Sequence, residues 1–483
     1  MSHTPELVIA NGTVVNSFGR RHAHIVIREG RISQLIDASE PVPDAVRTVD
    51  ATGHLVIPGG VDGHCHVAQV TGRFRTLDDY RTTSTAALWG GTTTIIDFGI
   101  PRDASETPLA AVLSKKELAT ESRCDVALHG SVISWDETVP WQLEQLAAEG
   151  VRSVKMYTTN RGTTMADGDT ILKVMREMVR LDGLTYIHAE HDPIIVDCTE
   201  QHADDGRIGI EHLHRTRPEL AEEVSVKETL AMAQYTGAPV YFVHQSTPGA
   251  VDLVTEARDR GQEAYSETCP HYLTLDDSVY GSSFPEWYAC CPPMRSAETV
   301  AALKERLRDG AIHTVSSDHS CYDLSQKRER TDDIRAMPHG LPGVETRMPV
   351  TFTAMAESGS RVEDFVEVFA AGPSRINAVP GKGTIAEGFD ADLVIFDPSE
   401  ERIVDGGALH MGTDFSPFDG NKLTGWPAVV VSAGRVVLDA GGFHDPGPVG
   451  RFVARNGFRE HAAATATDRP AAAATPAPAP ATF

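Results

Sequence analysis

The chain has 483 residues, of which 41% are hydrophobic and 23% are charged, and its formal net charge is −25. This length exceeds one ordinary domain and allows a large buried core. The acidic excess argues against nucleic acid and anionic membranes as partners. The composition is typical of a soluble globular enzyme.

Neither a membrane span nor a disulfide framework is expected. No apolar run approaches the ~20 residues that cross a bilayer, and the N-terminus lacks the basic and apolar regions of a signal peptide. The seven cysteines follow no regular spacing, and the adjacent Cys290 and Cys291 cannot easily form a bridge. These features favour a reduced, cytoplasmic protein.

Both ends of the chain predict short β-strands. Residues 6–36 are rich in β-branched side chains and are interrupted by Asn-Gly and Glu-Gly turn signals. The same texture returns in residues 383–441. We predict one small β-sandwich domain that is built from residues 1–56 and 385–450.

Short apolar runs alternate with amphipathic helical stretches between these two regions. The runs span residues 54–66, 92–99, 125–132, 151–158, 184–190, 238–246, 263–273 and 311–320. About eight strand–helix units over a little more than ~250 residues are typical of a (β/α)₈ TIM barrel, an α/β fold. An open doubly wound sheet would need a glycine-rich phosphate loop after its first strand, and the sequence has none. We predict the barrel for residues 57–384.

The last part of the chain, residues 451–483, is predicted to be a C-terminal arm. After about His461 it consists mainly of Ala, Pro and Thr, with almost no apolar bulk. Such a segment cannot bury enough surface to fold alone, so we expect a disordered or loosely bound tail.

Polar side chains suited to catalysis stand at the ends of five of the eight runs. They are His64 and His66 in the first run, followed by Lys155, His188, His244 and Asp318. The ends of parallel barrel strands converge on one face, where active sites lie. Because side chains alternate along a strand, His64 and His66 point to the same side.

Each of these residues has a simpler interpretation when it is taken alone. A histidine at a strand end is commonly structural, Asp318 could cap a helix, and Lys155 could extend its amine to water. A lysine inside a protein, however, is costly unless it is paired or neutralised. Six such residues at the same end of five strands favour one functional site over separate explanations.

Nine motifs occur in the order found in one enzyme family. They read PGGVDGHCH, VKMY, IHAEHD, FVHQS, ETCPHYL, CCPPMR, SSDHS, GLPGVETR and GKGTIAEGFDADLVIFD. From about Pro5 to Asn456, the chain closely resembles cyclic amidohydrolases of the dihydropyrimidinase and hydantoinase branch. Allantoinases and dihydroorotases are more distant members of this group.

The resemblance accounts for the lysine in the fourth run. In this family the barrel lysine reacts with CO₂, which implies that Lys155 is an N6-carboxylysine. A neutral amine adds CO₂, and two cations stabilise the carbamate that forms. The modification removes a buried ammonium group and supplies an anionic oxygen to each of two metal ions.

The resemblance also implies two zinc ions, with manganese as an alternative. One ion would be held by His64, His66 and Asp318, the other by His188 and His244, with carboxylated Lys155 bridging them. Imidazole and carboxylate groups suit zinc. A hydroxide shared by the metals would attack a ring amide, and Asp318 would carry its proton to the departing nitrogen.

Three residues near the expected substrate depart from the family pattern. Relatives place an oxyanion-stabilising tyrosine five residues after the carboxylated lysine, where this chain has Asn160; Tyr157 stands where relatives have a packing phenylalanine. Either Asn160 or another loop group donates to the oxyanion, or the substrate differs, which we favour. Cys291 replaces a serine and His339 an asparagine at positions that hold the ring through backbone groups, and Cys291 could be a small buried filler.

Arginines occupy the loops that should line the mouth of the barrel. Relatives usually have apolar or aromatic residues there, whereas this chain has Arg73, Arg75, Arg102 and Arg161. They could clamp a carboxylate on the substrate through bidentate hydrogen bonds. The simpler interpretation is that they pair with the many surface acids.

We therefore predict a two-metal hydrolase that opens hydantoins, dihydropyrimidines or related cyclic imides or ureides. An allantoinase or dihydroorotase-like enzyme is the nearest alternative. A non-catalytic scaffold of the same fold is another, although such relatives have lost metal ligands that this chain keeps. The resemblance also suggests a homotetramer that acts on small molecules.

Overall fold

The computed structural model describes residues 4–103 and 105–467, and its centre is a barrel of eight parallel strands. In sheet order these are β15 (Thr314–Val315), β14 (Ala264–Thr268), β13 (Val240–Phe242), β12 (Leu184–His188), β11 (Ser153–Tyr157), β10 (Asp125–Ser131), β9 (Thr92–Gly99) and β6 (Gly60–Cys65). The first and last strands meet where the His66 N–H donates to the His319 carbonyl at 2.8 Å. Each of the eight predicted apolar runs contains one of these strands, so the predicted barrel is confirmed.

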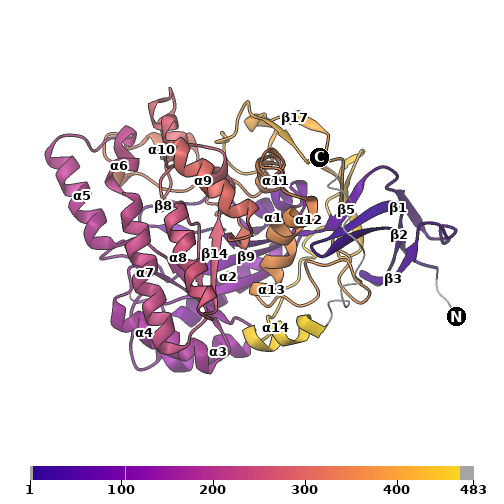
Figure 1. Cartoon of the computed structure of the whole chain (residues 1–483), viewed down its shortest axis with the longest axis horizontal. Coiled ribbons are helices and arrows are strands. Elements are labelled where there is room, and N and C mark those ends of the chain that lie inside the picture. The colour runs from indigo at the N-terminus through magenta and orange to yellow at the C-terminus, as the bar shows by residue number, and fades with distance from the viewer. Residues whose placement is uncertain (1–3, 104, 468–483) are drawn as a thin grey trace.

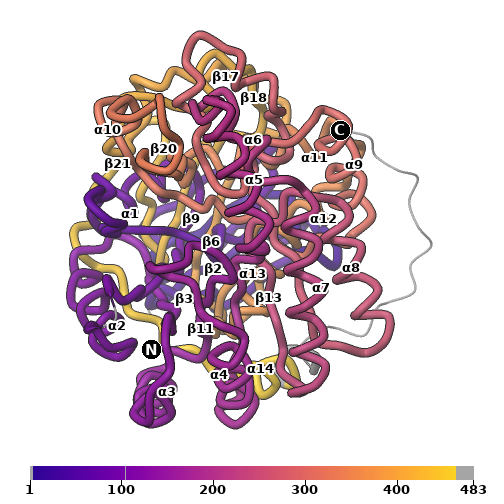
Figure 2. The backbone as a smooth tube through the Cα atoms, turned by 90° about the vertical axis from the view of Figure 1, so that its left-hand side faces the viewer, coloured from indigo at the N-terminus to yellow at the C-terminus, as the bar shows by residue number. Residues whose placement is uncertain are grey.

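Helices surround the strands, as Figure 2 shows for α2, α3, α4, α7 and α8. They are α1 (Tyr80–Trp89), α2 (Pro108–Leu118), α3 (Val139–Ala148), α4 (Gly168–Arg180), α5 (Asp192–Asp204), α6 (Leu213–Thr216), α7 (Glu219–Thr236), α8 (Pro248–Asp259), α9 (Ala297–Arg308), α10 (Leu324–Arg328), α11 (Arg347–Glu357), α12 (Val362–Val366) and α13 (Gly372–Ile376). The parallel barrel strands are apolar and buried because helices cover their outer face. No helix in the part of the chain that the structure describes is long and apolar enough to cross a membrane.

A nine-stranded mixed sheet joins the two ends of the chain beside the barrel (Figure 1). It contains β1 (Leu7–Asn16), β2 (Gly19–Arg28), β3 (Arg31–Asp37), β4 (Arg47–Asp50), β5 (Leu55–Pro58), β16 (Leu393–Phe396), β19 (Pro427–Ser432), β20 (Arg435–Asp439) and β21 (Gly442–Phe443). The early strand β5 pairs with the late strand β16, which confirms that both termini build one β-rich unit. The residue boundaries of the domains stay predictions.

Two small hairpins complete the strands. They are β7 (Val70–Thr71) with β8 (Phe74–Arg75), and β17 (Glu401–Ile403) with β18 (Lys422–Thr424). The first hairpin follows the barrel strand β6 and therefore lies at the carboxyl end of the barrel.

The start of the predicted C-terminal arm packs against the barrel. The Val453 N–H donates to the Val126 carbonyl of β10, and the Val126 N–H donates to the Arg451 carbonyl. The Arg455 side chain is buried and donates to the Ser153 hydroxyl at 2.7 Å. Helix α14 (Phe458–Thr467) follows. The Ala/Pro-rich part of the predicted tail, residues 468–483, lies outside the described residues.

A buried lysine joins the amino end of the barrel to the β-rich unit. The Nζ atom of Lys382 lies 2.6 Å from Asp125 at the start of β10, 3.1 Å from Asp390 and 2.5 Å from Asp392. Arg451 adds a second cation at 2.6 Å from Asp125. Arg31 is a third cation, at 3.2 Å from Asp390. The three carboxylates thus pair with three cations where the two parts of the protein meet.

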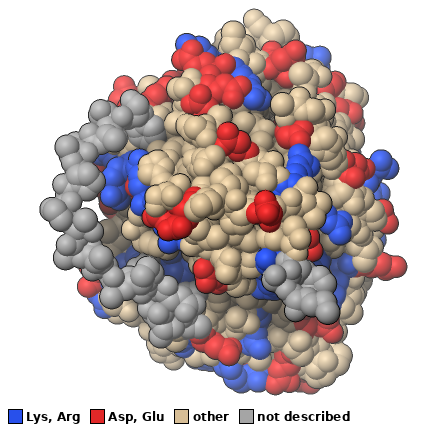
Figure 3. Space-filling model, turned by 90° about the vertical axis from the view of Figure 1, so that its right-hand side faces the viewer, with Lys and Arg blue, Asp and Glu red and all other residues tan. Residues whose placement is uncertain are grey.

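The face that carries the β-rich unit has charges of both signs (Figure 3). Acidic and basic side chains are interspersed around a largely uncharged centre on this face.

Candidate metal centre

The carboxylate of Asp318 lies between the two histidines of the first barrel strand. Its Oδ1 atom is 3.1 Å from His64 Nε2 and 3.2 Å from His66 Nε2. His64, His244 and Asp318 each offer a ligand atom, and these atoms all lie within 4.8 Å of one another. Three separate strand ends therefore converge on one point, as the barrel geometry predicts.

The remaining two imidazoles adjoin this group. The ring of His188 lies 4.5 Å from that of His244, and the ring of His244 lies 5.4 Å from that of His64. His188 ends β12, and His244 follows β13, the next strand of the barrel. The four predicted histidines consequently form one continuous cluster.

Two of these residues have unusual backbone conformations. The φ angle is +39° at His244 and +49° at Asp318, which places both in the left-handed region. Side chains rarely adopt this region unless the surrounding structure imposes it, and such positions concentrate at functional sites. The backbone is thus strained at the two positions from which these side chains enter the cluster.

Lys155 lies inside this cluster without an acidic partner. Its side chain is 1% exposed, and its Nζ atom is 3.4 Å from His64 Nε2, 4.9 Å from the Phe98 ring and 5.2 Å from the Tyr157 ring. No described carboxylate lies within ion-pair distance of Nζ. Burial lowers the pKa of Lys155 to about 8. This lysine is therefore far easier to deprotonate than a surface lysine.

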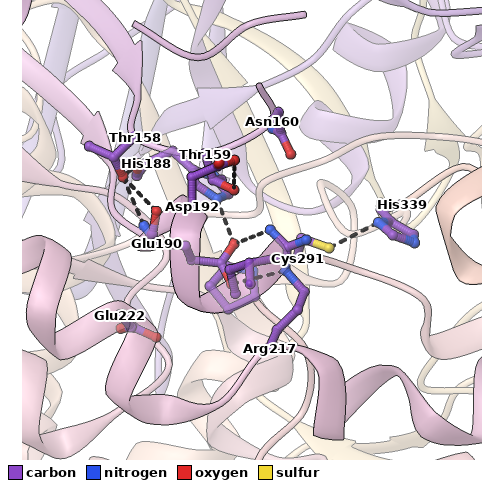
Figure 4. Close-up of polar contacts among 12 residues, drawn as sticks. Thr158, Thr159, Asn160, His188, Glu190, Asp192, Arg217, Glu222, Cys291 and His339 are labelled. Carbon is purple, nitrogen blue, oxygen red and sulfur yellow. Dashed lines mark hydrogen bonds and ion pairs between the residues drawn. The ribbon is translucent and has the colours of Figure 1, made fainter. Parts of the chain in front are cut away.

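Two buried glutamates, which the sequence analysis did not identify, orient the histidines. Glu267 Oε1 lies 2.7 Å from His64 Nδ1, and Glu190 Oε2 lies 2.8 Å from His188 Nε2. Arg217 in turn binds Glu190 through two hydrogen bonds of 2.6 and 3.0 Å (Figure 4). Carboxylates that fix the second nitrogen of a histidine are typical of metal sites. An acid at or near the end of a barrel strand is the sequence signal that could have identified both.

Burial sets the protonation of the imidazoles. It lowers the pKa of His66 and His188, and it lowers the pKa of His244 well below its usual value. Burial alone would raise the pKa of Asp318, but the imidazoles, His64 first, hold that pKa well below its usual range. Neutral rings of His66, His188 and His244 and an ionised Asp318 are the states in which these groups bind metal.

The side chains present fit a group of divalent cations. The Nδ1 atoms of His66 and His244 are buried and have no hydrogen-bond partner among the described residues, which is costly for a polar atom. Imidazole nitrogens with one carboxylate match the ligand preferences of zinc. The cluster therefore has the donor set of a metal centre.

The loop residue Asn160 lies outside the cluster. It is exposed, its φ angle is +71°, and its amide nitrogen is 3.4 Å from the Thr164 hydroxyl of the same loop. In Figure 4 it stands apart from His188 and Glu190. The structure does not test its predicted catalytic role.

Cys291 and His339 contact each other across two loops at the mouth of the barrel. The Cys291 Sγ atom is 2.9 Å from His339 Nδ1 (Figure 4). Burial raises the pKa of Cys291 to about 12 and lowers that of His339 to about 3. A neutral thiol thus donates a hydrogen bond to a neutral imidazole. The Cys291 Sγ and His339 Nδ1 atoms are therefore hydrogen-bond partners of each other. Their predicted contact with substrate stays untested.

Three of the four arginines predicted at the mouth are paired with acids. The Nε atom of Arg102 lies 3.0 Å from Glu106. The guanidinium of Arg73 is 2.6 Å from Glu329, and that of Arg161 is 2.5 Å from Asp192. Arg75 is exposed, and its side chain bonds to no residue that the structure describes. These contacts agree with the simpler interpretation for the paired arginines, and a role in substrate binding stays a prediction.

Comparisons with known proteins agree with this geometry. The model of the Amidohydrolase family matches residues 55–437. A D-hydantoinase from Ralstonia pickettii is 33% identical over 94% of this chain and all of its own length. A dihydropyrimidinase from Rattus norvegicus is 31% identical over 95% of this chain and 91% of its own. The crystal structure of dihydropyrimidinase from Brevibacillus agri superimposes with a TM-score of 0.90 at 31% identity, covering 93% of this chain and 99% of that one.

The match covers the sheet strand β5, the whole barrel and the return to β20. Family membership suggests a binuclear metal site, and the cluster of His64, His244 and Asp318 offers candidate ligands for it. The chain belongs to the amidohydrolase family.

Proposed function

We propose that this protein is a metal-dependent hydrolase that opens the cyclic amide bond of hydantoins, dihydropyrimidines or related rings. The relatives named D-hydantoinase and dihydropyrimidinase support this activity. One observation carries it most directly: Lys155 is buried among histidines with no described carboxylate within ion-pair distance. An ordinary structural lysine would not be stable there, whereas a lysine that becomes an anion between two cations would be.

The proposed cofactor is a pair of divalent metal ions, zinc by preference and manganese as the alternative. The proposed ligands are His64, His66, Lys155, His188, His244 and Asp318. Lys155 would bind as its carbamate after adding CO₂. When bound, the metal pair supplies an activated water and polarises the ring carbonyl.

Individual side chains of the site orient the histidines and transfer the proton. Glu267 holds the proton of His64 on Nδ1 and so presents Nε2 to the centre. Glu190 accepts from Nε2 of His188 and leaves Nδ1 free. Asp318 takes a proton from the attacking water and delivers it to the departing ring nitrogen, as general base and then general acid. The product is an N-carbamoyl amino acid or a related opened amide.

The loops around the centre are proposed to bind the substrate ring. The candidate residues are Asn160, Cys291 and His339, with Arg73, Arg75 and Arg161 farther out. Three of these positions differ in side chain from the related hydantoinases, which supports a preferred substrate different from theirs.

A substrate panel tests the proposal. Metal-loaded protein is assayed for ring opening of dihydrouracil, aliphatic and aromatic hydantoins, carboxylated hydantoins, allantoin and simple imides, with Lys155→Ala as the blank. We expect turnover of at least one ring and none in the variant. Protein that purifies with bound metal but opens no ring would contradict the proposed activity, and protein that binds no metal would support a scaffold role.

We also propose a homotetramer, which the family resemblance supports, and a cytoplasmic location, which the irregular cysteine spacing supports. Light scattering on the purified protein measures the oligomeric state, and a monomer at micromolar concentration would contradict the proposal.

A further inference from the structure

The residue at the usual oxyanion position uses its amide within its own loop. After β11 ends at Tyr157, the chain leaves the barrel and returns at Ala166, whose N–H donates to the Tyr157 carbonyl at 2.9 Å. Asn160 lies on the exposed part of this excursion, near the Thr164 hydroxyl. An exposed amide is a weak donor to a buried oxyanion, because water competes for it.

A different polar group faces the metal centre from the same strand. Tyr157 follows Lys155 by two residues and therefore points to the same side of β11. Its ring centroid is 5.5 Å from that of His188, and the Lys155 amine lies 5.2 Å from the ring. The side chain is 9% exposed. The phenol thus borders the proposed reaction site inside the barrel.

The hydroxyl of Tyr157 differs from those of other buried tyrosines. Tyr186, Tyr241 and Tyr272 bind Asn377, Glu267 and Pro292 at 2.5, 2.7 and 2.6 Å, respectively. The Tyr157 hydroxyl bonds to no residue that the structure describes. Because no described residue uses this hydroxyl, the group is available for a ligand.

We propose that the Tyr157 hydroxyl donates a hydrogen bond to the substrate carbonyl oxygen as that oxygen becomes negative. The inference rests on the proposed function and assigns the donor that Asn160 does not supply. The proton stays on the phenol, and no bond other than this hydrogen bond is made or broken by Tyr157. Because hydrogen bonds to a charged oxygen are stronger than those to a neutral one, the interaction favours the transition state over the bound substrate.

Tyr157→Phe tests the proposal, since it removes only the hydroxyl and restores the side chain that relatives have there. We expect kcat on the best ring substrate to fall by about 10²–10³-fold, the typical loss for one oxyanion donor. The KM, the metal content and the melting temperature should stay close to those of the unaltered protein. A loss of bound metal, or a kcat within threefold of the original, would overturn the assignment.

Two further variants separate catalysis from packing. Tyr186→Phe removes another barrel hydroxyl and leaves Asn377 without its partner, so it should lower the melting temperature but not kcat. Asn160→Ala should reduce kcat by much less than Tyr157→Phe. If Asn160→Ala causes the larger loss, Asn160 is the donor and the proposal is wrong.

A binding measurement gives a readout that does not depend on turnover. Calorimetry with N-carbamoyl-β-alanine, the product of opening dihydrouracil, places a carboxylate oxygen where the ring carbonyl stood. Tyr157→Phe should weaken this binding by about tenfold or more, as expected for a hydrogen bond to a charged group, and equal affinity would contradict the proposal. If the unaltered protein opens no ring at all, the proposed function fails first and the role of Tyr157 falls with it.

Discussion

The two ends of the barrel each bury a lysine, but in opposite surroundings. At the carboxyl end, Lys155 has histidine and aromatic neighbours and no described acid within ion-pair distance. At the amino end, Lys382 lies within 3.1 Å of three aspartates. Burial lowers the pKa of Lys155 to about 8. Burial also acts on Lys382, but the aspartates, Asp392 first, outweigh it and raise that pKa.

These surroundings indicate a structural role for Lys382 and a chemical role for Lys155. A buried ammonium is tolerated when carboxylates compensate its charge, and Lys382 meets that condition. Lys155 does not meet it, and with a pKa of about 8 a far larger fraction of it is neutral amine at neutral pH than for a surface lysine. A neutral amine is the form that adds CO₂. The absence of a partner is thus the functional feature of Lys155.

The comparison predicts that Lys155→Ala has the largest effect on activity. Turnover should fall to the level of metal-free protein, because the group that joins the two proposed metal sites is lost. The melting temperature should change little when both proteins are compared without metal, since Lys155 makes no ion pair and bound metal itself adds stability. Elemental analysis by mass spectrometry and the ring-opening assay measure both effects. A variant that keeps two metals and its turnover would contradict the proposed chemical role of Lys155.

Lys382→Ala should produce the opposite pattern. Its loss leaves three buried carboxylates with only the partly exposed Arg31 and Arg451 as described cations near them, and breaking a buried ion pair from one side costs about 3–5 kcal/mol. Urea denaturation should show this loss in the free energy of unfolding, while metal content per folded protein stays unchanged. The control Lys116→Ala breaks an exposed pair with Glu149 and should cost at most about 1 kcal/mol.

Glu267→Gln should weaken metal binding without unfolding the protein. The carboxylate fixes the ring of His64, and loss of such a partner typically costs about 10–100-fold in metal affinity or activity. Competition with a chelator measures the affinity. Glu345→Gln alters another buried carboxylate–histidine pair, with His410 at 2.9 Å, and should leave the metal affinity unchanged. Equal losses in both variants would show that burial of the acid, not its contact with His64, matters.

The smallest effect is expected from the thiol–imidazole contact. Replacing Cys291 by serine and His339 by asparagine restores the side chains of relatives and removes one hydrogen bond. A net contribution of about 0.5–1.5 kcal/mol corresponds to about a 2- to 10-fold change, which we expect in KM. Values of kcat and KM on neutral and acidic rings test for a larger role. A change of preferred substrate in the double variant would show that Cys291 and His339 select the ligand.

The six proposed metal ligands could be identified from the sequence because barrel geometry makes their convergence almost automatic. Parallel strands end at one face, so polar residues at the ends of separate runs must meet there. The order of the motifs identified the family, and six of the nine motifs lie at the ends of barrel strands. Local sequence patterns were therefore sufficient to predict most of the fold and the centre of the site.

The partners of these residues depended on contacts between segments that are distant in the chain. Glu267 meets His64 across 203 residues, and Lys382 meets Asp125 across 257; no local pattern encodes such pairs. The placement of Asn160 on an exposed loop, with Tyr157 beside His188, followed from how the chain leaves β11. The sequence by itself determined which groups are present at the strand ends. Only the tertiary structure decided which of them are paired, because hydrogen bonds and ion pairs depend on distances that the folded barrel alone creates.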